Sequence, residues 1–407
     1  MGVRDDLISI VEAGLDSVDG RLCVAKALAE NINADDKVAV VAVGKAAPAM
    51  LEGALEVVAE QLVSGLLISK TGCAVSTLLP DCIDCYIGGH PIPNEESLVA
   101  GQALIDYVSR LSLDTKLIVL ISGGASALVE VLPDNVSLSQ LQALNNYLLH
   151  SGRDIYAMNR LRQSVSKIKA GRLAQYINAG KTRSYIMSDV GNNELSIIGS
   201  GLLAPSYHQI DLDDLPKWVR QCCLSEPELP VDSDEEFNHI EQTVIADLDQ
   251  ALSAMEFKAV SSDYDAFNHG KTIEGDVKAF ADRVADYLIR APIGIHIWGG
   301  ETTVDINEPK GVGGRNTYLA LLLAEKLRGF EGIVLATVAT DADDGNSDCA
   351  GALVDGETLD EANICSELVG SALSKANSAE LLGRAHALLH FAKGRSNVAD
   401  LLVAIKH

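Results

Sequence analysis

The fold is decided by Lys37-Val-Ala-Val-Val-Ala-Val43, a continuous run of apolar, mostly β-branched residues that ends at Gly44. Such a run is typical of a strand that is covered on both faces, as in a parallel sheet between two layers of helices. Residues 45–60 follow with helical spacing, and residues 65–69 read as a second buried strand. The order strand, glycine, helix, strand therefore predicts an α/β fold.

The same alternation continues along the chain in both directions from an acidic, proline-bearing segment, residues 224–236, which we interpret as a domain boundary. It predicts a mostly parallel sheet with helices on both faces. The predicted strands are 117–122, 183–189, 257–261, 293–298 and 332–340, and the predicted helices are 1–18, 96–112, 138–150, 237–254, 273–290 and 316–328.

Composition narrows the classes of partner. The chain has 407 residues, of which 47% are hydrophobic and 22% charged, as in a globular protein of two or three domains. Its formal net charge of −25 argues against nucleic acid as a partner. No apolar run approaches the roughly 20 residues that span a membrane, and acids stand where a signal peptide needs positive charge. We expect a cytoplasmic protein, and the sequence leaves a homodimer open.

An acidic protein that binds an anion must supply cations locally, so basic residues beside glycines are the first candidates. Lys45 follows Gly44 at the end of the first strand. A lysine in a first helical turn opposes the helix macrodipole, which disfavours a purely structural role. Arg315 follows a glycine-rich segment, residues 311–314, at a predicted helix start. Its fork of donors matches the oxygens of a phosphate or carboxylate.

Polar residues close three further strands. The loop Ser122-Gly-Gly-Ala-Ser126 exposes amides and hydroxyls that suit phosphate or carboxylate oxygens, although a tight strand-to-helix turn explains the same glycines. Asp189 can hold Mg²⁺, accept a hydroxyl proton or cap a helix. Asp341, Asp343 and Asp344 can bind a metal, and the Asp-Gly turn there accounts for part of the cluster.

Two other features have two readings each. His90, in the stiff loop Gly88-Gly-His-Pro-Ile-Pro93, lines a site or is a hydrogen-bonded structural residue. Cys82 and Cys85 form a lone CxxC, which is more often a pair of reduced core residues than a zinc or redox site. The chain lacks the Walker loop, the GxSxG elbow and the dinucleotide GxGxxG. Cations, carboxylates and glycine turns at strand ends together favour phosphoryl transfer.

In these same segments the chain resembles the glycerate 2-kinases, the MOFRL class of glycerate kinases. The resemblance covers nearly the whole length and keeps the order of nine motifs. They are VAVGKAAPAM (41–50), GGHPIPNEES (88–97), ISGGASAL (121–128), MNRLRQSVSKIKAGRLA (158–174), SDVGNNELSIIGSG (188–201), GGETTV (299–304), GGRN (313–316), TDADDGNSDCAGALVDG (340–356) and SNVADL (396–401).

The resemblance implies a larger N-terminal, doubly wound, Rossmann-like α/β domain (1–230), a smaller C-terminal MOFRL-type α/β domain (231–407) and an active site in the interdomain cleft. It implies ATP-dependent phosphorylation of D-glycerate to 2-phosphoglycerate with Mg²⁺, so the partners would be a small hydroxy acid and a nucleotide. The implied site residues fall into three groups: catalytic Lys45, Asp189 and Arg315; binding Gly44, His90, Ser122, Gly123, Gly124, Ser126, Asn159, Arg162, Glu301 and Asn316; and metal-binding Asp341 and Asp344, with Asp189.

Two other functions compete with the kinase. One is an oxidoreductase that acts on hydroxypyruvate, which would need the nicotinamide-binding fingerprint that this sequence lacks. The other is a sugar-acid or nucleotide sensor built on a kinase scaffold. A sensor need not keep transition-state groups, so the presence of Lys45, Asp189 and Arg315 favours the kinase.

Overall fold

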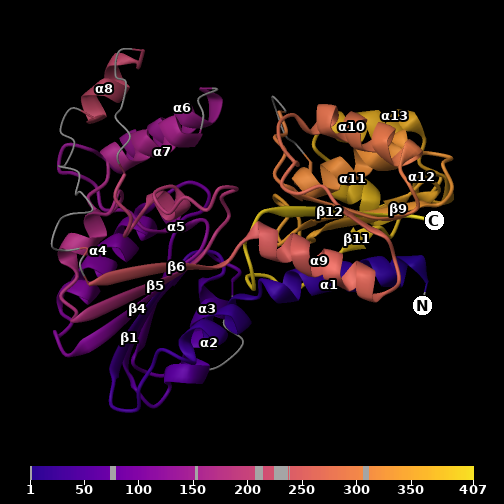
Figure 1. Ribbon diagram of the computed structural model, residues 1–407. Coiled ribbons are helices and arrows are strands. Elements are labelled where there is room, and N and C mark those ends of the chain that lie inside the picture. Colours follow the sequence, from indigo (N-terminus) through magenta and orange to yellow (C-terminus); the bar gives the residue numbers. More distant parts are fainter. Residues whose placement is uncertain are drawn as a thin grey trace. The chain divides into compact units, whose positions relative to one another are not determined.

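The computed structural model describes residues 2–73, 79–151, 155–206, 214–223, 237, 239–305 and 311–407 (Figure 1). These residues form two compact units, here called the N-terminal unit (Gly20–Ile245) and the C-terminal unit (Met1–Asp19 with Ala246–His407). The division differs from the expected domains, 1–230 and 231–407, chiefly because the first 19 residues join the C-terminal unit. The expected boundary segment, 224–236, lies outside the described residues.

The N-terminal unit is built on a six-stranded sheet in the order β3-β2-β1-β4-β5-β6, the doubly wound order of Rossmann folds. Every pairing from β3 through β5 is parallel. The first strand is as predicted, and all its residues after Lys37 are buried. The strands are β1 (Lys37–Val43), β2 (Leu62–Ser69), β3 (Ile83–Ile87), β4 (Thr115–Ile121), β5 (Lys181–Met187) and β6 (Ile240–Ala246).

Helices cover both faces of this sheet (Figure 1). One face carries α2 (Gly20–Leu28) and α3 (Ala47–Val58), and the other carries α4 (Glu95–Ser109) and α5 (Ala125–Leu128). A separate apolar cluster joins α6 (Leu138–His150), α7 (Ile155–Ser164) and α8 (Lys217–Cys223). Two short 3₁₀ turns, η1 (Arg172–Tyr176) and η2 (Ile198–Ser200), complete the described elements of the unit.

The C-terminal unit holds a second six-stranded sheet, in the order β11-β10-β9-β12-β8-β7. Its central strand, β12, runs antiparallel to both of its neighbours, β8 and β9, which therefore point the same way. Strands β7 and β8 are parallel, while β9, β10 and β11 pair antiparallel. The strands are β7 (Ala266–Asn268), β8 (Gly294–Gly300), β9 (Ile333–Ala339), β10 (Gly351–Asp355), β11 (Leu388–Leu389) and β12 (Asp400–Lys406).

This second sheet is also sandwiched between helices (Figure 1). The helices α1 (Val3–Ser17) and α9 (Leu248–Ser261) pack together on one face, where Leu7, Ile10 and Val11 of α1 are buried. The other face carries α10 (Val277–Arg290), α11 (Arg315–Lys326), α12 (Thr358–Glu361), α13 (Ser366–Ser374) and α14 (Ser378–Arg384). The predicted N-terminal helix is thus present, and its apolar face belongs to the C-terminal core.

One stretch of the prediction is wrong. Residues 237–254 were expected to form a helix and 257–261 a strand, but β6 ends at Ala246 and α9 runs on through Ser261. The helix starts at 248 because the Asp247 side chain accepts a hydrogen bond from the amide of Gln250, as an N-cap does. Phe257 and Val260 are residue types that favour a strand, but both are exposed on the helix.

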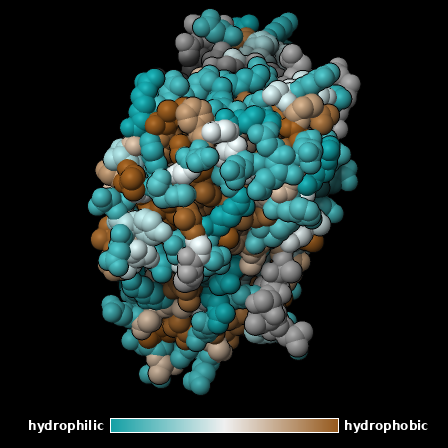
Figure 2. Space-filling model, turned by 90° about the vertical axis from the view of Figure 1, so that its right-hand side faces the viewer, coloured by the Kyte–Doolittle hydropathy of each residue, from teal (hydrophilic) through white to brown (hydrophobic). Residues whose placement is uncertain are grey.

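The surface agrees with the composition. The face shown in Figure 2 is mostly hydrophilic, with apolar residues in smaller groups between the polar ones. Among the described residues, no helix is both long and apolar enough to cross a membrane.

A stack of aromatic and imidazole rings packs on the C-terminal sheet beside β8. His296 is fully buried, and its Nδ1 lies 3.2 Å from the Tyr287 hydroxyl and 3.4 Å from Nε2 of His269. The His269 ring stacks on Trp298 with 4.4 Å between centroids. Burial lowers the pKa of both histidines, and each loses further basicity to a neighbouring positive charge, His296 for one and Lys406 for the other.

We expect the stability of the C-terminal unit to fall as the pH drops below about 6.5, the ordinary histidine value. In that pH range the histidines of the unfolded chain bind protons, whereas those of the folded state, whose pKa values are lowered, do not. Proton uptake therefore favours unfolding. Trp298 fluorescence in a Trp218→Phe background reports the unfolding locally. His296→Gln should flatten the pH dependence, and an unfolding midpoint that stays constant from about pH 7.5 to about 5.5 would contradict the assignment.

Candidate functional site

The strand order of the N-terminal sheet reverses between β1 and β4, and ligands of doubly wound folds bind beyond the carboxyl ends of the strands at such a point. The segments that follow these two strands are Gly44-Lys45 and the loop Ser122–Ser126. Sequence patterns alone marked both as site candidates. The topology brings them side by side.

Backbone hydrogen bonds tie the two segments together. The Lys45 amide donates to the Gly123 carbonyl at 3.0 Å, and the Ala46 amide donates to the Ser122 hydroxyl at 3.0 Å. Gly44 has a φ of 134°, and a Cβ there would lie 2.1 Å from the Ser122 Oγ. Only glycine fits this approach. Because α3 begins at Ala47, Lys45 precedes the helix instead of lying in its first turn, as had been expected.

Gly124 adjoins two of the predicted site side chains. A Cβ at this position would lie 3.1 Å from both Lys45 Cγ and His90 Cδ2. Its φ of 85° is in the left-handed region that favours glycine. The structure therefore brings Lys45, His90 and the glycine loop together, and their roles in a site stay predictions.

The loop that carries His90 is held by the start of α4. The Gly89 amide donates to the Asn94 side chain at 3.0 Å and to the Ser97 hydroxyl at 2.9 Å. Asn94 in turn caps the helix, because its side chain accepts from the Ser97 amide. This arrangement fixes the backbone on which the half-buried His90 sits.

Ser126 and Asn159 meet through a residue that the sequence reasoning did not assign. The Ser200 hydroxyl lies 2.8 Å from the Ser126 hydroxyl and donates to Oδ1 of Asn159 at 2.8 Å. Arg162, one turn along α7, donates through Nε to Asn145 of α6 at 3.0 Å, and burial lowers its pKa. Ser200 has a φ of 59°, unusual for a residue other than glycine, and that geometry leaves no mark in a single sequence.

Buried charges hold the C-terminal end of α7 in place. Arg172 donates to the carbonyls of Gln163 at 2.9 Å and of Ser166 at 3.1 Å. Lys169 pairs with Glu130, and both side chains are almost fully buried. Burial raises the pKa of the Glu130 carboxyl despite the ammonium beside it. Removal of one partner would leave a costly uncompensated charge, so this pair fixes the segment that follows α7, while Arg172 holds the end of the helix itself.

Asp189 lies at the same edge of the sheet, two residues beyond the end of β5. Its side chain is half-buried. The preceding Ser188 folds the chain back locally, because its hydroxyl accepts from the Val190 amide at 3.3 Å and donates to the Val190 carbonyl at 3.1 Å. No helix starts here among the described residues, so the capping alternative for Asp189 loses its basis.

A second group of candidates gathers at one end of the C-terminal sheet. Glu301 follows β8, and Asp341 follows β9. Strand β12 runs the opposite way and begins at Asp400, which pairs with Gly300 on one side and Ala339 on the other. The start of β12 therefore lies beside the ends of β8 and β9. This register adds Asp400 to the group, a residue that the sequence reasoning had left unassigned.

Arg315, the first residue of α11, lies between two carboxylates. Its Nη1 is 2.9 Å from Glu301 Oε2, and its Nε is 3.1 Å from Asp400 Oδ2. Burial lowers the pKa of the guanidinium, but Asp400 and Glu301 raise it by more, so the net shift is upward. Burial raises the pKa of Asp400, Glu301 adds to that rise, and Arg315 opposes it only in part.

Asp344 caps α11. Its Oδ2 accepts from the amides of Gly314 at 3.0 Å and Thr317 at 2.8 Å and from the Thr317 hydroxyl at 2.7 Å, while Oδ1 accepts from the Asn316 amide at 2.9 Å. A carboxylate at this position satisfies the free amides and complements the positive end of the helix. A protein carboxylate thus already occupies the amides of Gly314, Asn316 and Thr317 at the start of α11.

The metal prediction fits these contacts poorly for one of its residues. Asp344 uses both oxygens for four hydrogen bonds, so coordination of Mg²⁺ would uncap α11. Asp341 accepts a backbone hydrogen bond from Asp343 at 3.1 Å. Within the described ranges, no group of three or more His, Cys, Asp or Glu side chains could hold a metal ion. Asp341 and Asp189 stay predictions as ligands, and Asp344 has a structural task instead. In the described part of the chain, Cys82 and Cys85 belong to no such group, and both are exposed rather than in the core.

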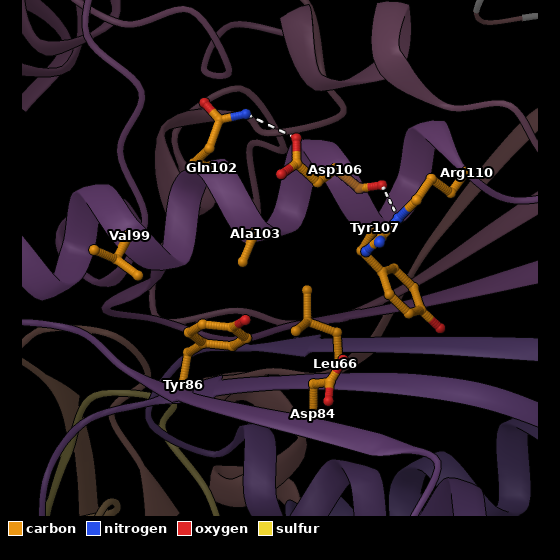
Figure 3. A pocket seen from close by; sticks show the side chains of 9 residues that line it. All are labelled: Leu66, Asp84, Tyr86, Val99, Gln102, Ala103, Asp106, Tyr107 and Arg110. Carbon is orange, nitrogen blue, oxygen red and sulfur yellow. Dashed lines mark hydrogen bonds between the residues drawn. The ribbon is translucent and has the colours of Figure 1, made fainter.

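A hollow of about 470 Å³ lies between α4 and strands β2 and β3 (Figure 3). Leu66 and Tyr86 point from the strands toward Ala103 and Tyr107 of the helix. The Tyr107 hydroxyl lies 2.9 Å from the Ser64 hydroxyl, and burial raises the pKa of Tyr107 to about 12. Two carboxylates and one guanidinium line the hollow, which does not suit an anion, and none of the predicted site residues reaches it.

Comparisons with known proteins give the family. The family described as a domain of unknown function, DUF4147, matches residues 6–224, and the MOFRL family matches residues 294–400. A D-glycerate 2-kinase from Thermotoga maritima is 32% identical over 91% of each chain. A crystal structure of glycerate kinase from the same organism superposes with a TM-score of 0.83 at 28% identity and covers 100% of this chain and 99% of its own.

The chain belongs to the glycerate 2-kinase family. It is an enzyme of the phosphotransferase class with an alcohol group as acceptor. The family also contains proteins with another name, since a putative hydroxypyruvate reductase from Agrobacterium vitis is 30% identical over 88% of this chain and 84% of its own. The predicted family and fold class are confirmed. The residues around Lys45 in the N-terminal unit and those around Arg315 in the C-terminal unit are the candidates for the chemistry of a glycerate 2-kinase.

We expect Gly124→Ala to lower kcat, because the added methyl would press on Lys45 and His90 and would force alanine into a left-handed conformation that costs about 1–2 kcal/mol. Gly191→Ala is the matched control, since a Cβ there meets nothing within 4 Å. Steady-state kinetics of both variants, with circular dichroism to confirm folding, test this. Equal kcat values for the two variants would remove Gly124 from the site.

Proposed function

We propose that this glycerate 2-kinase family member transfers the γ-phosphoryl group of ATP to a hydroxyl of D-glycerate and forms 2-phosphoglycerate, with Mg²⁺ bound to the nucleotide. One observation carries the proposal. In a chain with a net charge of −25, Lys45 lies at the topological switch point of the N-terminal sheet and Arg315 at the strand ends of the C-terminal sheet. Catalysis of phosphoryl transfer rests on such positioned positive charge.

Lys45 is proposed to neutralise negative charge on the transferring phosphoryl group. Its backbone is tied to the glycine loop through the Gly123 carbonyl, so the position of its Cα is set by β1 and β4 together. The amides of Gly123 and Gly124 would cradle oxygens of the same group. Ser122 would support this loop, because its amide donates to the Val43 carbonyl at 3.0 Å and its hydroxyl accepts from the Ala46 amide at 3.0 Å. Ser126 is linked to Asn159 through Ser200, which keeps both polar side chains beside this loop.

Asp189 is proposed to accept the proton of the substrate hydroxyl as the phosphoryl group arrives. A carboxylate at the carboxyl end of a strand, where ligands of this fold bind, is the kind of group that accepts such a proton. Arg315 would bind carboxylate or phosphoryl oxygens of the ligands through its fork of donors. His90, Arg162, Glu301 and Asn316 are proposed to line the substrates rather than to react.

When bound, Mg²⁺ would neutralise charge on the nucleotide phosphates. Hard cations of this kind keep several waters and use one or two carboxylates, so Asp341 and Asp189 are sufficient candidates. Asp344 is not proposed as a ligand, because it caps α11. Activity should vanish in EDTA and return with excess Mg²⁺, and full turnover after exhaustive chelation would contradict the metal requirement.

The proposed reaction is tested with purified protein, ATP and a panel of hydroxy acids that includes D-glycerate, L-glycerate and tartronate. Phosphorus NMR of the product locates the phosphorylated hydroxyl, which we expect to be that of carbon 2 of D-glycerate. A parallel incubation with hydroxypyruvate and NADH, followed by absorbance, examines the reductase alternative. Oxidation of NADH without ATP-dependent product would overturn the kinase assignment, and ligand binding without turnover would favour a sensor.

Lys45→Ala should lower kcat by about 10²-fold or more, the usual loss when a single electrostatic stabiliser is removed. Lys37→Ala is the control on the same strand. Lys37 lies at the other end of β1 in an exposed ion pair with Asp114, at 2.6 Å, and such pairs contribute about 0–1 kcal/mol. Lys37→Ala should therefore leave kcat unchanged. A folded Lys45→Ala variant with the kcat of the parent would exclude the proposed role.

A further inference from the structure

The two carboxylates that contact Arg315 differ in their freedom to move. The Asp400 side chain is 7% exposed, whereas those of Glu301 and Arg315 are 45% and 41% exposed. Asp400 contacts Nε, on the inner edge of the guanidinium, and Glu301 contacts Nη1. The two ion pairs therefore belong to different classes, one buried at a sheet end and one open to solvent.

The backbone before Asp400 is pinned by Thr340. The Thr340 amide and hydroxyl donate to the Ala399 carbonyl at 3.2 Å and 2.7 Å, and the Val398 amide donates to the Thr340 hydroxyl at 2.8 Å. Ala399 itself has a φ of 78°, which a non-glycine residue adopts only under such constraint. The Asp400 side chain is 7% exposed, so it has little room to turn away from Nε of Arg315. Asp400 cannot leave Arg315 without disruption of the sheet end.

Glu301 has no such anchor on its side chain among the described contacts. Its amide donates to the Ile273 carbonyl at 2.8 Å, so its backbone is fixed while its carboxylate extends into solvent. A solvent-exposed ion pair contributes little and exchanges readily with another anion. A ligand carboxylate or phosphate can present two oxygens to the same edge of the guanidinium and replace Glu301 there.

We infer that Asp400 is a positioning residue that holds the guanidinium of Arg315 through Nε, and that Glu301 is a displaceable counter-ion on Nη1 whose place an anionic ligand takes. The inference rests on the proposed role of Arg315 as the ligand cation. Since Asp344 occupies the amides at the start of α11, the side chain of Arg315 provides the positive charge at this strand end. Its orientation then decides how the anion is held.

Substitutions of the two carboxylates should change different kinetic constants, KM for Glu301 and kcat for Asp400. Glu301→Gln removes a competitor for Arg315, so the KM of the anion that binds there, D-glycerate or ATP, should fall by up to about fivefold, the value of an exposed ion pair. Asp400→Ala frees the guanidinium to rotate, so kcat should fall by about 10²-fold, as for other small misplacements of catalytic groups. Asp400→Asn keeps an acceptor for Nε and should recover part of that loss.

A double-mutant cycle separates positioning from a merely structural role. If Asp400 acts through Arg315, Asp400→Ala should cost nothing further in an Arg315→Ala background. A structural residue would lower kcat by the same factor in both backgrounds, and that result would overturn the inference. Thermal melting confirms folding, and Asp400→Asn keeps the test open if Asp400→Ala fails to fold.

A binding measurement tests the displacement of Glu301 by a ligand independently of turnover. Isothermal titration calorimetry with D-glycerate, and separately with ATP, should show tighter binding of one of them to Glu301→Gln than to the parent. Weaker binding of both would contradict displacement by the ligand. A parent enzyme that binds these ligands but does not phosphorylate D-glycerate would instead refute the proposed function and leave the roles of Asp400 and Glu301 to be judged by calorimetry alone.

Discussion

The antiparallel insertion of β12 between β8 and β9 is the constraint on which the C-terminal group of site residues depends. It makes the start of the last strand coincide with the ends of two earlier ones, so Asp400, Glu301 and Arg315 meet although they are far apart in sequence. Leu402 and Ala404 of the same strand join the apolar core under α11. One strand thus anchors the core and places the carboxylate that orients Arg315, which links the stability of the unit to the geometry of its site.

The candidate cations of the two units have similar surroundings. The protein is strongly acidic, yet the basic residues at the strand ends are embedded among glycine turns or paired carboxylates. Asp344 fills the positive start of α11, and Ser122 occupies the amide of Ala46 at the other sheet. Anion binding then relies on side-chain cations more than on free amides. Such side chains can exchange partners, whereas a capped helix start cannot do so without loss of its cap.

The parts of the fold that follow from local sequence patterns could be predicted. Those that follow from how strands pair, or from which core a helix joins, could not. Strand β1 and the loops after β1 and β4 were evident because a buried parallel strand has a continuous apolar run that glycine ends. Strand β12 went unrecognised, so its antiparallel register, and with it Asp400, was out of reach. Asp344 was predicted as a metal ligand because an acidic cluster in sequence does not reveal which backbone amides its carboxylates meet. The expected domain boundary missed the N-terminal helix, since nothing in an amphipathic helix specifies which core it joins.

We propose that Arg315 acts through the geometry of its guanidinium and not only through its charge. Arg315→Lys tests this most directly, because lysine keeps the charge but loses both the two-pronged fork and the Nε that contacts Asp400. The measurement is kcat for ATP-dependent phosphorylation of D-glycerate, together with ATP affinity by calorimetry. We predict that kcat falls by about 10²-fold while ATP binding stays close to that of the parent. A kcat equal to that of the parent would show that Arg315 only anchors the start of α11.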